Sequence, residues 1–167
     1  PMPAAEIHIF KCLSDNCGAL VRDPITGAVA SVDVPDAAAV AAAAAAKGWR
    51  ISDILITHEQ ADHIQGVAAL KTATGAKVTG PQAALRDGAP VDRVVGEGQQ
   101  VAVGGLAFDV WATPGHAAGH LTYVSKAGKV ALPPMARAAL DHSLMQRGRP
   151  TTPARWSWET PLVGSLE

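Results

Sequence analysis

Hydrophobic and polar positions alternate in the first part of the chain, and this alternation is typical of β-strands. Residues 6–11, 19–23 and 28–33 are short runs with β-branched or alternating apolar residues. Turn-forming residues separate the runs, with Asp15 and Asn16 in the first gap and the segment 23–27 in the second. The three runs therefore predict an antiparallel meander.

The pattern then changes to one that favours helices and buried strands in turn. Asp36 is a favourable N-cap for an alanine-rich run that ends at Lys47, and Gly48 follows as a typical C-terminal stop. Residues 51–57 form an apolar run that predicts a buried strand. Apolar residues then recur at helical spacing over 62–71, in a helix that is expected to end near Gly75. Two successive βα units are expected here.

Strands and helices continue to alternate as far as residue 132. The expected elements are strands at 77–80, 101–103, 106–112, 121–125 and 129–132 and a short helix at 82–86. The composition then shifts at Pro133 to a segment rich in proline and arginine, and no repeat or linker divides the chain. We expect one α/β domain over residues 1–167, divergent from 133 to 167.

Charge and composition argue against several classes of function. Lys and Arg total 14 and Asp and Glu total 15, so no basic field favours nucleic acid, and a small-molecule partner is expected. The longest apolar run, 37–46, is shorter than the roughly 20 residues that span a bilayer, so no membrane association is expected. Cys12 and Cys17 cannot build a disulfide framework, and the start lacks a secretory signal pattern, which predicts a cytoplasmic location.

Potential metal ligands gather in two segments that follow predicted strands. The first carries His58, Asp62 and His63, and the second carries His116. In extended backbone His58 and Gln60 share a face, whereas Asp62 and His63 lie where the chain turns into helix and point to another centre. Imidazole and carboxylate are ligands that zinc and iron prefer, so the four residues predict a metal site.

The order and spacing of several motifs over residues 6–132 are similar to those of one family. The motifs are Asp15-Asn16, Val32-Asp33, Thr57-His58-Glu59-Gln60-Ala61-Asp62-His63 with Gly66, and Thr113-Pro114-Gly115-His116 with Gly119-His120. They resemble the hydroxyacylglutathione hydrolases, or glyoxalase II enzymes, of the metallo-β-lactamase superfamily. The resemblance implies an αββα sandwich with a pair of zinc, iron or manganese ions between its sheets. It also implies a glutathione thioester as substrate, with S-D-lactoylglutathione hydrolysed to glutathione and D-lactate.

Carried over position by position, the resemblance places His58 and His116 on the first metal and Asp62 and His63 on the second. Asp62 would also be the catalytic carboxylate that orients the attacking water. His120 corresponds to a histidine that supports the ligands, so it is outside the expected ligand set.

The chain departs from this family at two places. Gln60 stands where the family has a ligand histidine, and an amide oxygen is a weaker zinc ligand than an imidazole nitrogen. Residues 133–136 stand where the family has the aspartate that bridges both metals, and Asp141 is a displaced candidate for that role. The family's last metal-binding histidine and its C-terminal glutathione-binding helical domain have no counterpart in this sequence. The sandwich itself is expected to be incomplete at the C-terminus.

Two other functions stay open at this level. A mononuclear iron dioxygenase acting on glutathione persulfide needs only two histidines and one carboxylate, which His58, His116 and Asp141 can supply. A non-catalytic module with a degenerate site would bind one metal weakly or none. Metal content, thioester hydrolysis and oxygen uptake distinguish the three functions.

Overall fold

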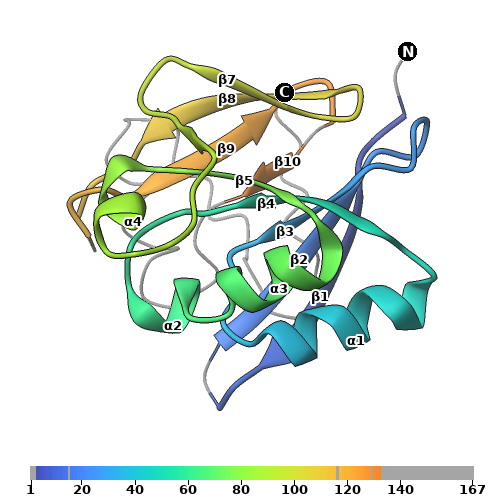
Figure 1. The fold of residues 1–167 in the computed structure, drawn as a ribbon. Coiled ribbons are helices and arrows are strands. Elements are labelled where there is room, and N and C mark those ends of the chain that lie inside the picture. Colours follow the sequence, from blue (N-terminus) through green and yellow to red (C-terminus); the bar gives the residue numbers. More distant parts are fainter. Residues whose placement is uncertain (1–2, 15, 116, 129, 133–167) are drawn as a thin grey trace.

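The computed structural model describes residues 3–14, 16–115, 117–128 and 130–132, and these form two β-sheets with helices (Figure 1). The larger sheet has six strands in the order β1-β2-β3-β4-β5-β6. Its strands are β1 (Glu6–Cys12), β2 (Asn16–Arg22), β3 (Val29–Val32), β4 (Ile51–Leu55), β5 (Lys77–Gly80) and β6 (Arg93–Val94). The first three are antiparallel, as the expected meander requires, and β3 to β6 run parallel.

The smaller sheet has four antiparallel strands in the order β10-β9-β8-β7. They are β7 (Gln100–Val103), β8 (Leu106–Ala112), β9 (Leu121–Ser125) and β10 (Val130–Leu132). Alternate residues of β7 and of the first part of β8 point inward, as a half-buried antiparallel strand requires. Phe108 and Tyr123 are the largest side chains in the core between the two sheets.

Helices cover the outer face of the larger sheet, where a second core forms (Figure 1). The helices are α1 (Ala37–Lys47), α2 (Ala61–Ile64), α3 (Val67–Thr74) and α4 (Gln82–Arg86). No described helix contributes a buried residue to the core between the sheets. The helical layer that an αββα sandwich has on its other sheet is therefore not among the described residues.

Local sequence signals set the limits of α1. The Asp36 carboxylate accepts hydrogen bonds from the backbone N–H groups of Ala38 and Ala39, which confirms the predicted N-cap. Gly48 has a φ of 67° and ends the helix in the left-handed conformation that glycine adopts without steric cost.

The helix expected from residue 62 to near Gly75 is two helices, because the chain after β3 packs between them. The Val34 N–H donates to the His63 carbonyl, and the Gly66 N–H donates to the Val34 carbonyl. A Cβ atom at Gly66 would lie only 2.7 Å from Val34 Cγ1 and 2.8 Å from the backbone nitrogen of Ala37. This close approach requires glycine, and it fixes α2 against the carboxyl end of β3.

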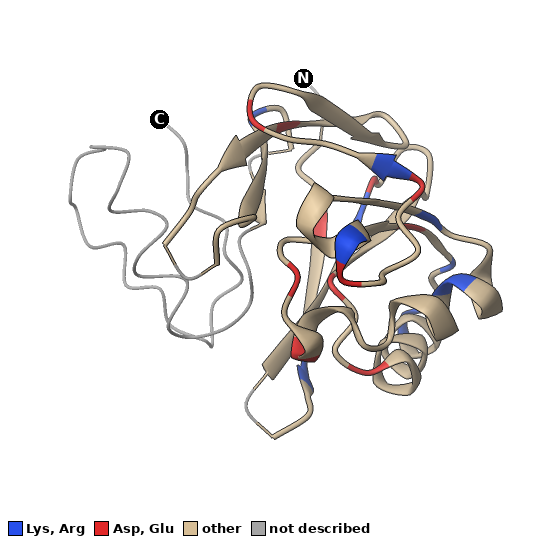
Figure 2. Ribbon diagram, turned by 60° about the vertical axis from the view of Figure 1, so that its left-hand side comes forward, with Lys and Arg blue, Asp and Glu red and all other residues tan. Residues whose placement is uncertain are grey.

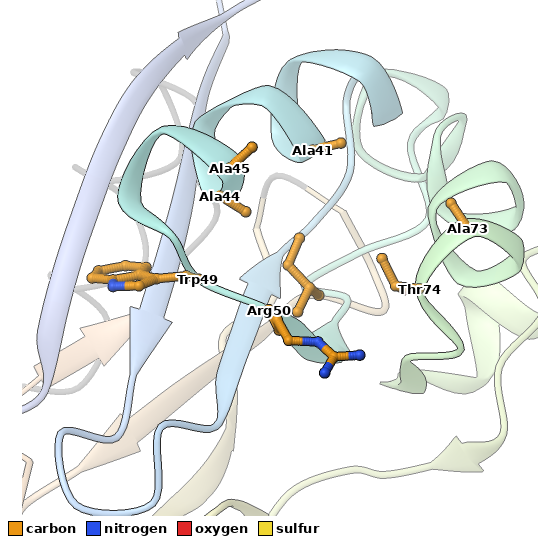
Figure 3. A pocket seen from close by; sticks show the side chains of 8 residues that line it. Ala41, Ala44, Ala45, Trp49, Arg50, Ala73 and Thr74 are labelled. Atoms are coloured by element: carbon orange, nitrogen blue, oxygen red, sulfur yellow. The ribbon is translucent and has the colours of Figure 1, made fainter.

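A shallow pocket of about 270 Å³ lies between α1, α3 and the start of β4. Figure 3 shows the side chains of Ala41, Ala44 and Ala45 facing this space from α1 and Arg50 lying at its edge. The short alanine side chains leave this space unfilled. Because β4 begins here at Ile51, the pocket lies at the opposite end of the strand from the predicted ligand residues.

Charged residues of both signs are spread over the described elements (Figure 2), in keeping with their near-equal numbers. Cys12 and Cys17 are free thiols. None of the described helices is long and apolar enough to cross a membrane.

Candidate metal centre

The candidate site lies where β3 and β4 end. These strands are parallel, so the residues that follow them, Asp33 and the segment beginning at Ile56, come to the same edge of the sheet. Asp33 has a φ of 57°, a left-handed conformation that aspartate adopts more readily than most residues. Its N–H donates to the Leu55 carbonyl, and its carbonyl accepts from the Ser31 hydroxyl. Asp33 is therefore held rigidly beside the end of β4.

The two residues before His58 are fixed by hydrogen bonds to three other parts of the chain. The Ile56 N–H donates to the Thr79 carbonyl of β5, and the Ile56 carbonyl accepts from the Tyr123 hydroxyl at 2.6 Å. The Thr57 N–H donates to Asp33 Oδ1 at 2.7 Å, and the Thr57 carbonyl accepts from the Leu121 N–H. Every backbone polar group of this dipeptide has a partner, so His58 starts from a rigid backbone.

Asp33 sets the protonation of both histidines. The Thr57 hydroxyl donates to Asp33 Oδ2 at 2.6 Å, so its oxygen is left to accept the Nδ1 proton of His58, 2.9 Å away. His63 Nδ1 also donates to Asp33 Oδ2, at 2.9 Å. Each imidazole thereby carries its proton on Nδ1 and presents Nε2 for another role, as supporting carboxylates do in metal sites.

His63 Nε2 is buried and has no hydrogen-bond partner among the described residues. Oδ2 of Asp62 lies 3.6 Å from this nitrogen. Asn16, at the start of β2, donates from Nδ2 to both Oδ2 and the backbone carbonyl of Asp62, at 3.1 and 3.0 Å. A buried nitrogen lone pair without a donor needs a partner, and a carboxylate oxygen held beside it makes a cation suitable.

The side chains of His58 and Gln60 form a second pair. Gln60 Oε1 lies 3.3 Å from His58 Nε2. The ring centroids of His58 and His63 are 4.1 Å apart, so the two pairs are neighbours. From the sequence spacing we expected His58 with Gln60, and Asp62 with His63, to point to different centres. In the structure they form two adjacent pairs.

The donor atoms have the separation that a metal requires. Two nitrogen or oxygen ligands about 2.0–2.1 Å from a tetrahedral ion lie about 3.4 Å apart. The Asp62–His63 and His58–Gln60 separations are close to this value. Ligand atoms of Asp33, His58 and His63 also lie within 4.8 Å of one another, and all three residues are buried. Because both Asp33 oxygens already accept hydrogen bonds, we interpret Asp33 as the residue that orients the histidines.

The electrostatics favour a charged carboxylate and a basic imidazole. Partial burial opposes ionisation of Asp62, but the Asn16 hydrogen bond and nearby His63 hold the pKa of Asp62 below its usual value. Burial likewise opposes the charged form of His63. The hydrogen bond and charge of Asp33, with the charge of Asp62, nevertheless raise the pKa of His63. A more basic imidazole is a stronger donor to a metal.

The second predicted segment, which follows β8, also places a histidine beside His58. The ring of His120 is buried, and its centroid lies 5.2 Å from that of His58. Its Nδ1 is 2.9 Å from the Thr113 hydroxyl, and the Thr113 N–H donates to the His120 carbonyl. His116 and Asp141 lie outside the described residues, so their predicted ligand roles stay predictions.

Sequence reasoning did not assign roles to Asp33, Thr57 or Asn16, although all three lie in motifs used for the resemblance. A signal for Asp33 was present, since an acidic residue at the carboxyl end of a parallel strand is well placed for a site. Nothing local to Asn16 pointed to Asp62, which is 46 residues away in the chain.

The family model for the metallo-beta-lactamase superfamily matches residues 23–133. Hydroxyacylglutathione hydrolase of Methylobacterium nodulans is 51% identical over 119 residues, which cover 71% of this chain and 46% of that protein. The same-named protein of Bradyrhizobium sp. is 48% identical over 126 residues, covering 75% and 49%. The chain thus spans about half the length of the curated relatives it matches.

Solved structures agree on the fold. The structure of ETHE1 from Myxococcus xanthus matches with a TM-score of 0.62 and 26% identity, covering 75% of this chain and 55% of that one. The BLEG-1 B3 metallo-beta-lactamase matches with a TM-score of 0.68 and 18% identity, covering 75% and 70%. These structures confirm the predicted metallo-β-lactamase fold, and the curated relatives confirm the resemblance to hydroxyacylglutathione hydrolases.

Proposed function

Because the chain belongs to the metallo-beta-lactamase superfamily, we propose that it is a metal-dependent thioester hydrolase. The proposed substrate is S-D-lactoylglutathione, and the products are glutathione and D-lactate. The proposal is supported by relatives named hydroxyacylglutathione hydrolase that are about half identical over the shared part.

One structural observation carries the proposal. The ring centroids of His58 and His63 lie 4.1 Å apart, and the Asp33 carboxylate fixes both tautomers, one directly and one through Thr57. Such fixed imidazoles beside the carboxylate of Asp62 form a donor set for zinc, iron or manganese. We propose zinc as the resident metal, with His58, Asp62, His63, His116 and Asp141 as its ligands.

The metal and the protein side chains would contribute different parts of the thioester hydrolysis. A bound metal would supply an activated water and polarise the thioester carbonyl. Asp62, kept ionised and oriented by Asn16, would accept a hydrogen bond from the attacking water and aim its oxygen at the carbonyl carbon. The water oxygen adds to the carbonyl carbon, and the C–S bond then breaks. The sulfur leaves with the bonding electrons as glutathione thiolate, and the proton that the water loses passes to solvent.

The test uses the chain loaded with zinc, with iron or with manganese. We expect metal retention after dialysis and release of glutathione from S-D-lactoylglutathione, both lost in the His63→Ala and Asp62→Ala variants. Hydrolysis that persists in both variants would refute the assigned site.

The other two functions are outcomes of the same experiment. Oxygen uptake with glutathione persulfide, in the absence of thioester hydrolysis, would identify the dioxygenase instead. A chain that retains no metal and turns over neither substrate would be the non-catalytic module. The single domain over residues 1–167 and the cytoplasmic location stay predictions.

A further inference from the structure

Glu59 lies between His58 and Gln60 in the chain, but its carboxylate lies against the second ligand-bearing segment. A Cβ atom at Gly119 would be 3.2 Å from Glu59 Oε2 and 2.8 Å from the Cβ of Ala83. The Glu59 carboxylate, the main chain of Gly119 and helix α4, which carries Ala83, therefore meet at one point.

One oxygen of this carboxylate has no hydrogen-bond donor among the described residues. Glu59 Oε2 is buried and makes no hydrogen bond, and Glu59 forms no ion pair with any residue that the structure describes. A buried carboxylate oxygen without a donor costs free energy, and folded proteins nearly always supply one. The surroundings of Glu59 therefore indicate where its donor comes from.

The main chain beside Glu59 carries a suitable donor. Gly119 lies in the turn before His120, and its N–H donates to no acceptor in the described part of the chain. The chain directly after this turn is already fixed, because the Leu121 N–H donates to the Thr57 carbonyl at 2.7 Å. An acceptor without a donor and a donor without an acceptor consequently lie next to each other.

We propose that Glu59 is a positioning residue whose carboxylate accepts the Gly119 N–H in the metal-loaded protein. This bond ties the segment that carries His58 to the segment that carries the predicted ligand His116 and the buried His120. The His58 and His120 ring centroids are 5.2 Å apart, so a metal bound by both segments needs only a small movement to close them. The inference rests on the metal dependence of the proposed function.

The rival role for Glu59 is packing alone, and two substitutions separate the roles. Glu59→Met keeps a side chain of similar length and volume but removes the acceptor. Glu59→Gln keeps the shape and one acceptor oxygen. If packing is all that matters, both variants should resemble the wild type, whereas a hydrogen bond from Gly119 survives only in Glu59→Gln.

Zinc binding and amide exchange test this without any use of catalysis. Calorimetry measures zinc affinity, and NMR of the full chain labelled with ¹⁵N-glycine follows hydrogen exchange of the Gly119 amide. We expect Glu59→Met to weaken zinc binding about tenfold, the scale for residues that support metal ligands. In the zinc-loaded protein its Gly119 amide should exchange at least about tenfold faster than in the wild type. Glu59→Gln should stay within about threefold of the wild type in both measurements.

The matched control is Gln82→Met, which introduces the same side chain at an exposed position of α4 and should behave as the wild type. Circular dichroism of each metal-free variant verifies that it is folded. Wild-type zinc affinity or wild-type Gly119 exchange in Glu59→Met overturns the inference, and so does a wild-type chain that binds no zinc.

The result is separable from the proposed function. If Glu59→Met weakens zinc binding and exposes the Gly119 amide while no thioester is hydrolysed, the positioning role stands and the thioesterase proposal fails. If hydrolysis occurs and Glu59→Met leaves zinc affinity and Gly119 exchange unchanged, the thioesterase proposal stands and the positioning role fails.

Discussion

The two ends of β4 differ in the kind of side chain that surrounds them. At its carboxyl end, Asp33, Thr57 and His63 are buried polar residues joined by short hydrogen bonds. At its start, the alanines of α1 and α3 leave a pocket of about 270 Å³ with no such network among its lining residues (Figure 3). The first end fixes side-chain orientation, whereas the second is lined mainly by small apolar side chains around an unfilled space.

This difference shows where the fold requires particular residues. Buried polar groups are costly when a partner is lost, because the remaining donor or acceptor stays desolvated. Small apolar contacts lose little when one of them changes. Substitutions at the two ends should therefore differ in size and in whether they affect metal binding.

The largest effect is expected from Asp33→Ala. It leaves the Thr57 N–H, the Thr57 hydroxyl and the His63 Nδ1–H without their acceptor. At about 1–3 kcal/mol per buried unsatisfied group, the free energy of unfolding should fall by about 3 kcal/mol or more. Urea denaturation measures this change.

Two further variants isolate the cause. Asparagine also adopts the left-handed conformation of residue 33, so Asp33→Asn keeps the backbone and alters only the hydrogen bonds. It should be destabilised and should lose metal affinity. Asp87→Ala, an exposed control, should match the wild type. Wild-type stability in Asp33→Asn would mean that the network contributes little.

A smaller effect is expected from Asn16→Ala, which removes both hydrogen bonds to Asp62. The unfolding free energy should fall by about 1 kcal/mol, and zinc affinity should fall about tenfold because the carboxylate is no longer oriented. Calorimetric titration measures the affinity. Gln100→Ala loses a comparable hydrogen bond, to Asp109 in the smaller sheet, and should leave zinc affinity unchanged.

Asp23, at the end of β2 remote from the site, should affect stability only in acid. Its carboxylate accepts hydrogen bonds from the Thr26 hydroxyl and the Gly105 and Ile25 N–H groups, which lower its pKa from 3.8 to about 2. Since the folded pKa is the lower one, the stabilisation is full above 3.8 and is lost as the pH falls toward about 2.

Urea denaturation across that pH range checks the sign. The stability difference between the wild type and Asp23→Asn should be constant at neutral pH and should shrink as the solution is acidified through this window. A difference that grows in acid would contradict the assignment.

The smallest effect is expected from Ala45→Leu at the mouth of the pocket. Ala45 is exposed, so the larger side chain has room, and the change in unfolding free energy should stay within about 0.5 kcal/mol. Thermal denaturation measures it, and metal affinity should not change.

Sequence periodicity predicted most elements close to their observed limits. Helix α1 has the expected cap residues, Asp36 and Gly48, and the predicted hairpin of β7 and β8 is present. The short strand β6 was missed because its two residues carry no periodic signal. The break between α2 and α3 was also missed, since it depends on Val34 from another part of the chain.

What the sequence determined by itself was local: strand alternation, helix caps and the cluster of histidines and aspartate within six residues, from His58 to His63. These features depend on neighbours a few positions apart, which a sequence displays directly. The tertiary structure alone decided that Asp33 orients both histidines and that Asn16 holds Asp62. Those contacts join residues 24 to 46 positions apart, and only the pairing of β2, β3 and β4 brings them together.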